Sequence, residues 1–376
     1  MNSKSLLNIF WLSLKELRSF GSDLVMLLFV IYAFTGSVYI QATGISSEVN
    51  NASLAFVDED GSTLAKELLN AFYPPRFQLP QLISARDVED AMDRGMYMFV
   101  VVIPSRFELD LKAGRSPSIQ LNIDATAMQQ AAVGAGYINN IITDRVANYI
   151  YRTEETPKPP FNLVIRKMFN PNGISSWRNS VVAIINQITL LTVVLTGAAI
   201  LREREHGTLE HLLVMPLNAF EIAMAKVLAN SFVILVATVI SMFFVVKWAL
   251  QVPFAGSITL WLSGVVLYLF FATALGIFLG TVSRTMAQFS LLIILVVSIL
   301  QLLSGGSTPV ESQPVWLQYL TYLLPSRQFV SFSQIIIYRG GGFQAVWAQF
   351  LTVGIMGLAF FVYSLALFRR SIAVTK

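Results

Sequence analysis

Residues 180–216 read SVVAIINQITLLTVVLTGAAILREREHGTLEHLLVMP, and the organisation of the whole chain can be worked out from this stretch. Residues 180–200 are almost entirely apolar, and a helix of about 20 such residues crosses the hydrocarbon core of a bilayer. Residues 202–206, REREH, are all polar, so the apolar run ends abruptly. The stretch therefore predicts a transmembrane helix that opens into a short loop in water.

Further segments of the same apolar kind follow along the chain. Hydrophobic residues make up 55% of the 376 residues and charged residues 13%, about half the roughly 25% of a soluble chain, which excludes a water-soluble fold. Residues 310–338 are less apolar and are interrupted by Pro314 and Pro325, with Pro309 just before them, so they predict short re-entrant or interfacial helices, with a seventh span as the alternative. The sequence predicts six spans, at about 24–43, 180–200, 224–247, 258–282, 286–304 and 345–368.

A charge-rich block interrupts these spans. Residues 45–178 hold 28 of the chain's 48 charged side chains, which is a soluble composition. Short apolar strands alternate there with helical segments, a pattern typical of a small α/β domain. The strands are expected at 54–57, 97–103, 119–123 and 161–166, and the helices at 62–72, 85–94 and 126–151. The predicted fold class is an α-helical polytopic membrane protein with six transmembrane helices and an inserted α/β extracytoplasmic domain.

Basic residues in the short segments predict the orientation. With the N-terminus inside, ten Lys and Arg side chains fall in the cytoplasm and three outside, and basic residues are retained on the cytoplasmic side. Both termini are therefore expected inside and residues 45–178 outside. Residues 4–20 form an amphipathic pattern that predicts a helix along the inner membrane surface, or alternatively an extension of the first span. An aromatic belt at the outer interface is expected from Trp177, Trp248, Trp261, Trp316 and Trp347.

The expected domains are an amphipathic helix, a first span, an outer domain and a second membrane part. Their bounds are 1–22, 23–44, 45–178 and 179–376, the last containing a cytoplasmic loop at 202–218 and a re-entrant outer segment at 305–343.

The sequence shows no set of residues for catalysis. The chain has no cysteine, which excludes thiolate and Cys-metal chemistry, and the block at 45–178 has no histidine. His206 and His211 stand five residues apart, a spacing that points them away from each other on a helix. There is no phosphate-binding loop of the Gly-x-x-x-x-Gly-Lys-Ser/Thr type. We therefore expect no enzyme activity, no metal and no cofactor in this chain. A net charge of +4 without a basic stripe also excludes nucleic-acid binding.

The loop after the second span has signals for a short, well-defined helix. Gly207 interrupts the preceding helix, Thr208 is a good N-cap, and Glu210 in the first turn suits the helix dipole. Asn218 and Glu221 have the spacing of a capping box that opens the next span. The loop therefore predicts a docking surface; a capped turn in water is the alternative.

These residues resemble a known family. The loop is similar to the signature of ABC-2 type transporter permeases, and so is the segment from Leu303-Ser304-Gly305 through Leu324-Pro325 to Gly340–Gly342 before the last span. The large domain between the first two spans resembles the bacterial inner-membrane subgroup linked to multidrug-type export. Gly306-Ser307 stands where such permeases commonly have aromatic residues, which leaves the substrate open. The loop resemblance comprises Glu203, Glu205, Gly207, Thr208, Leu209, Glu210 and Leu212, with Pro216 and Lys226.

The resemblance implies a permease subunit that dimerises, with a second copy or a paralogue, and binds cytoplasmic ABC ATPase subunits. The helix around 208–215 would be the coupling helix, and residues 4–20 the connecting helix beside it. ATP hydrolysis on the partner would drive export across the bacterial inner membrane, of drugs or other amphipathic compounds, and a periplasmic adaptor protein is a further expected partner. Two alternatives are a mechanical coupler and a membrane-anchored protein that binds partners through the outer domain without translocating substrate.

Polar side chains within the spans are candidates for the translocation path, because polar groups in hydrocarbon are costly. In ABC-2 dimers spans two and five line this path, so the resemblance selects Asn186, Gln187 and Gln301. Ordinary hydrogen bonding between helices is the alternative. Gly276 and Gly280, four residues apart in the fourth span, predict a closely packed helix face.

Overall fold

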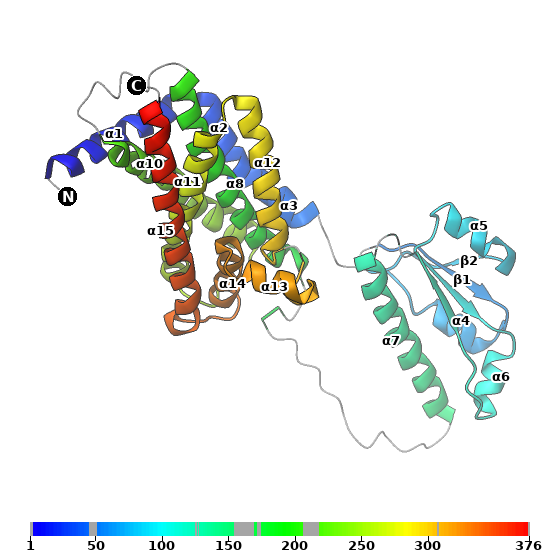
Figure 1. The fold of residues 1–376 in the computed structure, drawn as a ribbon. Coiled ribbons are helices and arrows are strands. Elements are labelled where there is room, and N and C mark those ends of the chain that lie inside the picture. Colours follow the sequence, from blue (N-terminus) through cyan, green and yellow to red (C-terminus); the bar gives the residue numbers. More distant parts are fainter. Residues whose placement is uncertain are drawn as a thin grey trace. The chain divides into compact units, whose positions relative to one another are not determined.

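The computed structural model describes residues 3–44, 51–124, 126, 128–153, 169–170, 174–205, 218–306 and 308–374. The chain divides into a helical unit, residues 1–45 and 167–376, and a second unit, residues 46–166. Figure 1 shows both units.

The described part of the helical unit contains six helical segments long and apolar enough to cross a membrane, as the sequence predicts. The first combines α2 (Leu24–Tyr32), a π-helical turn η1 (Ala33–Ser37) and α3 (Val38–Gly44). The third combines α10 (Ala219–Ser241) with a π-helical segment η4 (Met242–Ala249). The others are α8 (Ser175–Glu205), α11 (Ile258–Val282), α12 (Met286–Leu303) and α15 (Phe343–Val374).

Shorter elements complete this unit. The helix α1 (Ser3–Ser22) precedes the first span, over the segment where the sequence predicts an amphipathic helix. Between α12 and α15 lie a 3₁₀ turn η5 (Val310–Ser312) and two short helices, α13 (Val315–Tyr322) and α14 (Pro325–Ile337). Pro314 and Pro325 stand at the beginnings of these two helices, where a missing backbone N–H costs nothing.

The helix α11 forms the centre of the helical unit, where it packs against α8, α10, α14 and α15. Trp261 and Tyr268 are fully buried, and each has a partner for its polar atom. The Trp261 Nε1 donates to Ser333 Oγ on α14 at 2.8 Å, and the Tyr268 hydroxyl lies 2.8 Å from the Thr189 hydroxyl on α8. Buried aromatic residues of this kind require such partners, so these two bonds fix how α8, α11 and α14 meet.

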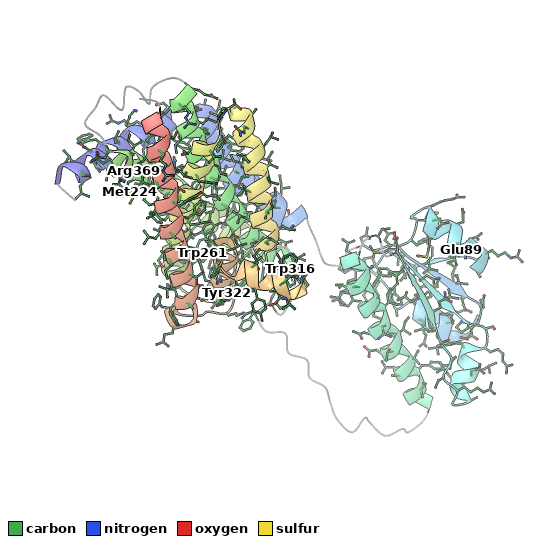
Figure 2. The ribbon with its side chains drawn as sticks, viewed as in Figure 1. Glu89, Met224, Trp261, Trp316, Tyr322 and Arg369 are labelled. Carbon is green, nitrogen blue, oxygen red and sulfur yellow. The ribbon has the colours of Figure 1, made fainter. Side chains whose placement is uncertain are left out.

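This burial changes the interpretation of one tryptophan. Trp248, Trp316 and Trp347 are exposed on the helical unit, as an interfacial belt requires, but Trp261 is not. The expectation that Trp261 belongs to the belt is wrong, because its indole fills the core between α11 and α14. Figure 2 shows Trp316 and Tyr322 near one end of the helical unit and Arg369 near the other.

The second unit has a four-stranded sheet with the order β2-β1-β3-β4. The strands are β1 (Leu54–Asp58), β2 (Gln81–Leu82), β3 (Phe99–Ile103) and β4 (Gln120–Ile123). The strand β1 pairs in parallel with β2 and β3, and β3 pairs antiparallel with β4. The helices are α4 (Thr63–Leu69), α5 (Val88–Asp93) after a 3₁₀ turn η2 (Ala85–Asp87), α6 (Phe107–Lys112) and α7 (Met128–Thr153).

Both faces of the central strands are buried. Phe56 and Phe99 pack with α4 and α7 on one face, while Ala55 and Val100 face α5 on the other. This explains why β1 and β3 have continuous apolar sequences rather than alternating ones. The short elements β2 and α6 were not predicted from the sequence, and the expected strand at 161–166 lies outside the described residues.

Candidate functional site

A buried ammonium group joins three helices near the end of α8. The Lys226 side chain, on α10, is only 2% exposed, and its Nζ lies 2.7 Å from Glu203 Oε1 of α8 and 3.3 Å from Glu16 Oε1 of α1. A charge removed from water must be paired, and here two carboxylates share one cation. The arrangement therefore holds α1, α8 and α10 together at one point. Glu203 was predicted from the loop motif, whereas Glu16 was not.

The helix α1 has a second set of contacts along α10. Asn8 Nδ2 donates to Glu221 Oε2 at 3.4 Å, and Ser13 Oγ donates to the Ala225 carbonyl at 3.3 Å. Glu221 also accepts the Asn218 backbone N–H at 3.2 Å, which confirms the capping box predicted from the spacing. One carboxylate thus caps α10 and binds α1.

The opposite side of the α8 end contacts α11 and α15 through Arg204. Arg204 Nη1 donates to the carbonyls of Thr281 and Ser283, at 3.3 and 3.1 Å, and Nη2 donates to the Ser371 hydroxyl near the end of α15. These carbonyls belong to the C-terminal end of α11, where a cation is favoured by the helix dipole.

Glu205 Oε1 accepts the backbone N–H of Met286, the first residue of α12, at 3.3 Å. This is an N-terminal amide that has no partner within its own helix, so the carboxylate satisfies it. We call Glu16, Glu203, Arg204, Glu205, Glu221 and Lys226 the charged cluster. Through it, the last turn of α8 is fixed to α1, α10, α11, α12 and α15.

The loop that the charged cluster flanks lies outside the described residues. Gly207, Thr208, Leu209, Glu210 and Leu212 of the predicted coupling set fall there, within 206–217. The described part of the site consists of the two ends of this loop, at Glu205 and Asn218.

The residues that were predicted to line the translocation path make contacts with two different helical segments. Gln187 is buried, and its Nε2 donates to Ser37 Oγ in the first span at 2.9 Å. Asn186 is half-buried at the preceding position of α8, and its backbone carbonyl accepts from Gln301 Nε2 of α12 at 3.4 Å. The structure therefore brings Asn186 and Gln301 together, and it engages Gln187 with a different helix.

Arg204 and Glu16 were not singled out from the sequence. The signal for Glu16 is its place on the polar side of the pattern in residues 4–20, but the partner is more than 200 positions away. Arg204 binds main-chain carbonyls and a hydroxyl, which no charge pattern in the sequence indicates.

Comparison with known proteins identifies the family. The family model for the ABC-2 family transporter protein matches residues 22–368. The chain is 48% identical over 369 residues, 98% of this chain and 99% of the relative, to the inner membrane transport permease YhhJ of Escherichia coli K12. It is 29% identical over 330 residues, 86% of this chain and 88% of the relative, to the probable multidrug ABC transporter permease YbhR of the same organism. The chain therefore belongs to the ABC-2 transporter family, and it is the permease subunit of an ABC transporter.

Proposed function

We propose that this permease pairs with a second permease copy or paralogue and couples ATP hydrolysis by a separate cytoplasmic ATPase to export across the inner membrane. The observation that carries the proposal is the charged cluster. A displacement of the loop at 206–217 would be passed to five other helices, because the last turn of α8 is held by ion pairs and hydrogen bonds on both of its sides. A loosely attached loop would absorb the same displacement.

The proposed orientation places the charged cluster in the cytoplasm. Asp23, before α2, lies 3.9 Å from Arg202 at the end of α8, so the N-terminal end of the first span and the C-terminal end of the second are at the same end of the unit. The chain therefore leaves α3 and re-enters α8 at the opposite end. We propose that the unit at 46–166 is a periplasmic α/β domain inserted there, with both chain termini cytoplasmic.

The helix α1 would lie on the inner leaflet beside the ATPase. Leu6, Leu7, Phe10 and Trp11 are 54–60% exposed, while Ile9 is buried and Ser13 contacts α10. An amphipathic helix with one face packed on protein and one apolar face free fits a membrane interface.

For the substrate we propose an amphipathic compound, and for its path the surface near Asn186 and Gln301. YbhR is named a probable multidrug transporter permease, which supports the same class of substrate here. Asn186→Leu is expected to change substrate preference in an export assay, whereas Gln187→Leu, which breaks a bond within the chain, is expected to lower the amount of folded protein.

The proposal is tested by purifying the tagged full-length chain from membranes in mild detergent. A P-loop ATPase is expected to co-elute in near-equal ratio and to be lost from Glu205→Ala. Glu89→Ala, an exposed change in the second unit, is the matched control and should retain the ATPase. If no nucleotide-binding protein co-elutes, even after crosslinking at His211, the coupling proposal is wrong. If the ATPase co-elutes but no change at Asn186 or Gln301 affects export, the mechanical alternative is favoured over this path.

A further inference from the structure

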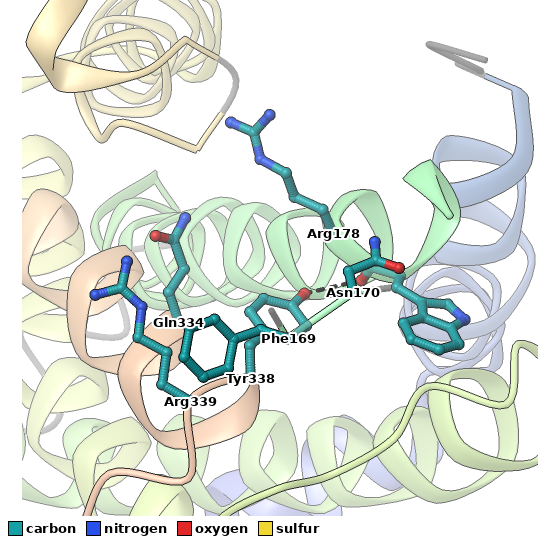
Figure 3. Close-up of a pocket in the computed structure, with 7 residues that line it drawn as sticks. Phe169, Asn170, Arg178, Gln334, Tyr338 and Arg339 are labelled. Atoms are coloured by element: carbon teal, nitrogen blue, oxygen red, sulfur yellow. Dashed lines mark hydrogen bonds between the residues drawn. The ribbon is translucent and has the colours of Figure 1, made fainter. Parts of the chain in front are cut away.

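Two adjoining cavities lie at the end of the helical unit where α8 begins. One has a volume of about 460 Å³ and a mostly polar wall from α14, the turn η5 and the residues after α12. The other has a volume of about 260 Å³ and three aromatic side chains among the residues that line it, and we call it the aromatic cavity. Arg178, Gln334 and Arg339 line both cavities. Figure 3 shows the aromatic cavity, with these three polar side chains extending toward the same side of the view.

The polar cavity has an excess of positive charge. Arg178, Arg327 and Arg339 line it, against the single carboxylate of Glu311 among its described lining residues. A guanidinium keeps its charge in proteins, so the arginines cannot relieve their mutual repulsion by losing protons. An anion in the cavity would relieve it.

The three arginines differ in how far the protein already uses them. Arg327 donates to the Gln318 carbonyl at 2.5 Å and to Thr321 Oγ1 at 2.8 Å, so it is held by α13. Arg178 donates through Nη2 to the Gly306 carbonyl at 3.0 Å. Arg339 has no hydrogen bond or ion pair with any residue in the described part of the chain. Arg339 and the remaining donors of Arg178 are therefore available to a ligand.

Hydrogen bonds hold side chains that line the aromatic cavity in place. The Tyr338 hydroxyl donates to the Trp177 carbonyl at 2.9 Å, as the dashed line in Figure 3 shows. Asn170 is held on Ile174 by two hydrogen bonds, at 3.0 and 3.1 Å, which places it on the same wall. Phe169, Trp177 and Tyr338 provide an apolar surface next to the cationic one.

We propose that the two cavities together bind an amphiphile with a net anionic phosphate headgroup. The phosphate lies between Arg178 and Arg339 in the polar cavity, where guanidinium groups can donate paired hydrogen bonds to its oxygens. The neighbouring apolar part of the molecule lies along Trp177 and Tyr338. This binding depends on the cavities alone and does not require the proposed coupling to an ATPase. The same headgroup chemistry could come from a membrane phospholipid or from free phosphate.

The test is a binding titration of the purified full-length chain in neutral detergent, with the heat of binding measured by calorimetry. The probes are short-chain phosphatidylglycerol, phosphatidylcholine of the same chain length and inorganic phosphate. Phosphatidylglycerol is expected to bind one site saturably, and phosphatidylcholine at least about tenfold more weakly, because its choline group cancels the headgroup charge. Arg339→Gln is expected to weaken phosphatidylglycerol binding about tenfold through the loss of charge-assisted hydrogen bonds.

Lys247→Gln is the matched control, because it removes one positive charge from an exposed position that lines neither cavity. Arg178→Gln is the second variant, to be used if Arg339→Gln does not elute as a folded protein. Inorganic phosphate is expected to bind far more weakly than phosphatidylglycerol. Equally tight binding of inorganic phosphate would overturn the proposal of an amphiphile, because the apolar surface would then contribute nothing and free phosphate would be the ligand. Equal binding of phosphatidylglycerol and phosphatidylcholine, or equal binding by the arginine variants and the Lys247 control, would overturn the proposal.

Discussion

Lys226 shows how one side chain can hold several helices together. Its buried ammonium lies between Glu203 and Glu16, and removing one partner of a buried ion pair typically costs about 3–5 kcal/mol because the other charges stay unpaired. Lys226→Met leaves two carboxylates facing each other. We expect it to loosen α1, seen as faster hydrogen exchange over residues 3–22 of the full-length chain.

A double-mutant cycle separates this effect from a general loss of packing. Adding Glu203→Gln to Lys226→Met removes part of the repulsion, so the double variant should recover some protection of α1. Lys247→Met, on the exposed part of η4, serves as control and should exchange like the unchanged protein. Unaltered exchange over residues 3–22 in Lys226→Met would show that the ion pairs contribute little.

Glu108 makes the second unit sensitive to pH. Hydrogen bonds from Lys112 and from the Tyr149 hydroxyl, at 2.5 and 2.6 Å, lower the pKa of Glu108 from 4.5 to about 2. Because the folded-state pKa lies below the unfolded one, the stabilisation is complete above about pH 4.5 and is lost as the pH falls through about 2.

Glu108→Gln should therefore destabilise the second unit more at neutral pH than at acidic pH. We expect lower hydrogen-exchange protection of α4, α6 and α7 than in the unchanged protein at pH 7, and a difference that narrows as the pH falls below 4.5. Glu89→Gln, at an exposed position of α5, is the control. A difference that is the same at every pH would contradict a role for the Glu108 charge.

At the scale of elements, the crossing of α8 and α11 depends on the absence of side chains. A Cβ on Gly280 would lie 2.7 Å from the Gly197 carbonyl oxygen and 3.0 Å from the Gly197 Cα. A Cβ on Gly276 would lie 2.9 Å from the Val193 carbonyl oxygen. This confirms the close-packing face predicted from the four-residue spacing, and it adds Gly197 as the partner.

Gly280→Val should force these two helices apart. Backbone atoms cannot move aside as a flexible side chain can, so we expect a cost of about 1–3 kcal/mol or more, measured as a lower melting temperature of the detergent-solubilised chain. Gly354→Ala in α15 is the control, because its Cβ would meet only Leu267 at an ordinary 3.5 Å. Equal melting temperatures for the two variants would argue against a tight α8–α11 contact.

At the scale of the whole molecule, the absence of cysteine from the chain allows a direct test of the proposed topology. A single cysteine at Glu89 should react with a membrane-impermeant maleimide added to cells whose outer membrane has been permeabilised. A single cysteine at Arg284, exposed in the connection between α11 and α12, should react only after the inner membrane is opened. The reverse pattern would invert the orientation and place the charged cluster outside.

Much of the architecture was predictable because a membrane span is recognised from the length and hydrophobicity of one continuous stretch of sequence. Each span must be about 20 residues long and apolar, so six runs of that kind predict six membrane helices, and the described residues form six helices that are long and apolar enough to cross a membrane. The loop pattern around Glu203 and Glu205 predicted the family, which the match over residues 22–368 confirms. The capping box at Asn218 and Glu221 was predictable because it depends on residues three positions apart.

The remaining features depend on residues that are distant in the sequence. Hydrophobicity does not distinguish a span that faces lipid from one that faces protein, so neither the central place of α11 nor the burial of Trp261 could be predicted from composition. A charge pattern likewise does not say which carboxylates lie around Lys226, or that Arg178 and Arg339 meet at one cavity. The sequence by itself determined the spans and the family, because both are read from local patterns. The tertiary structure decided which polar groups meet. A buried charge is costly unless it is paired, and the partners within its reach depend on how the helices pack.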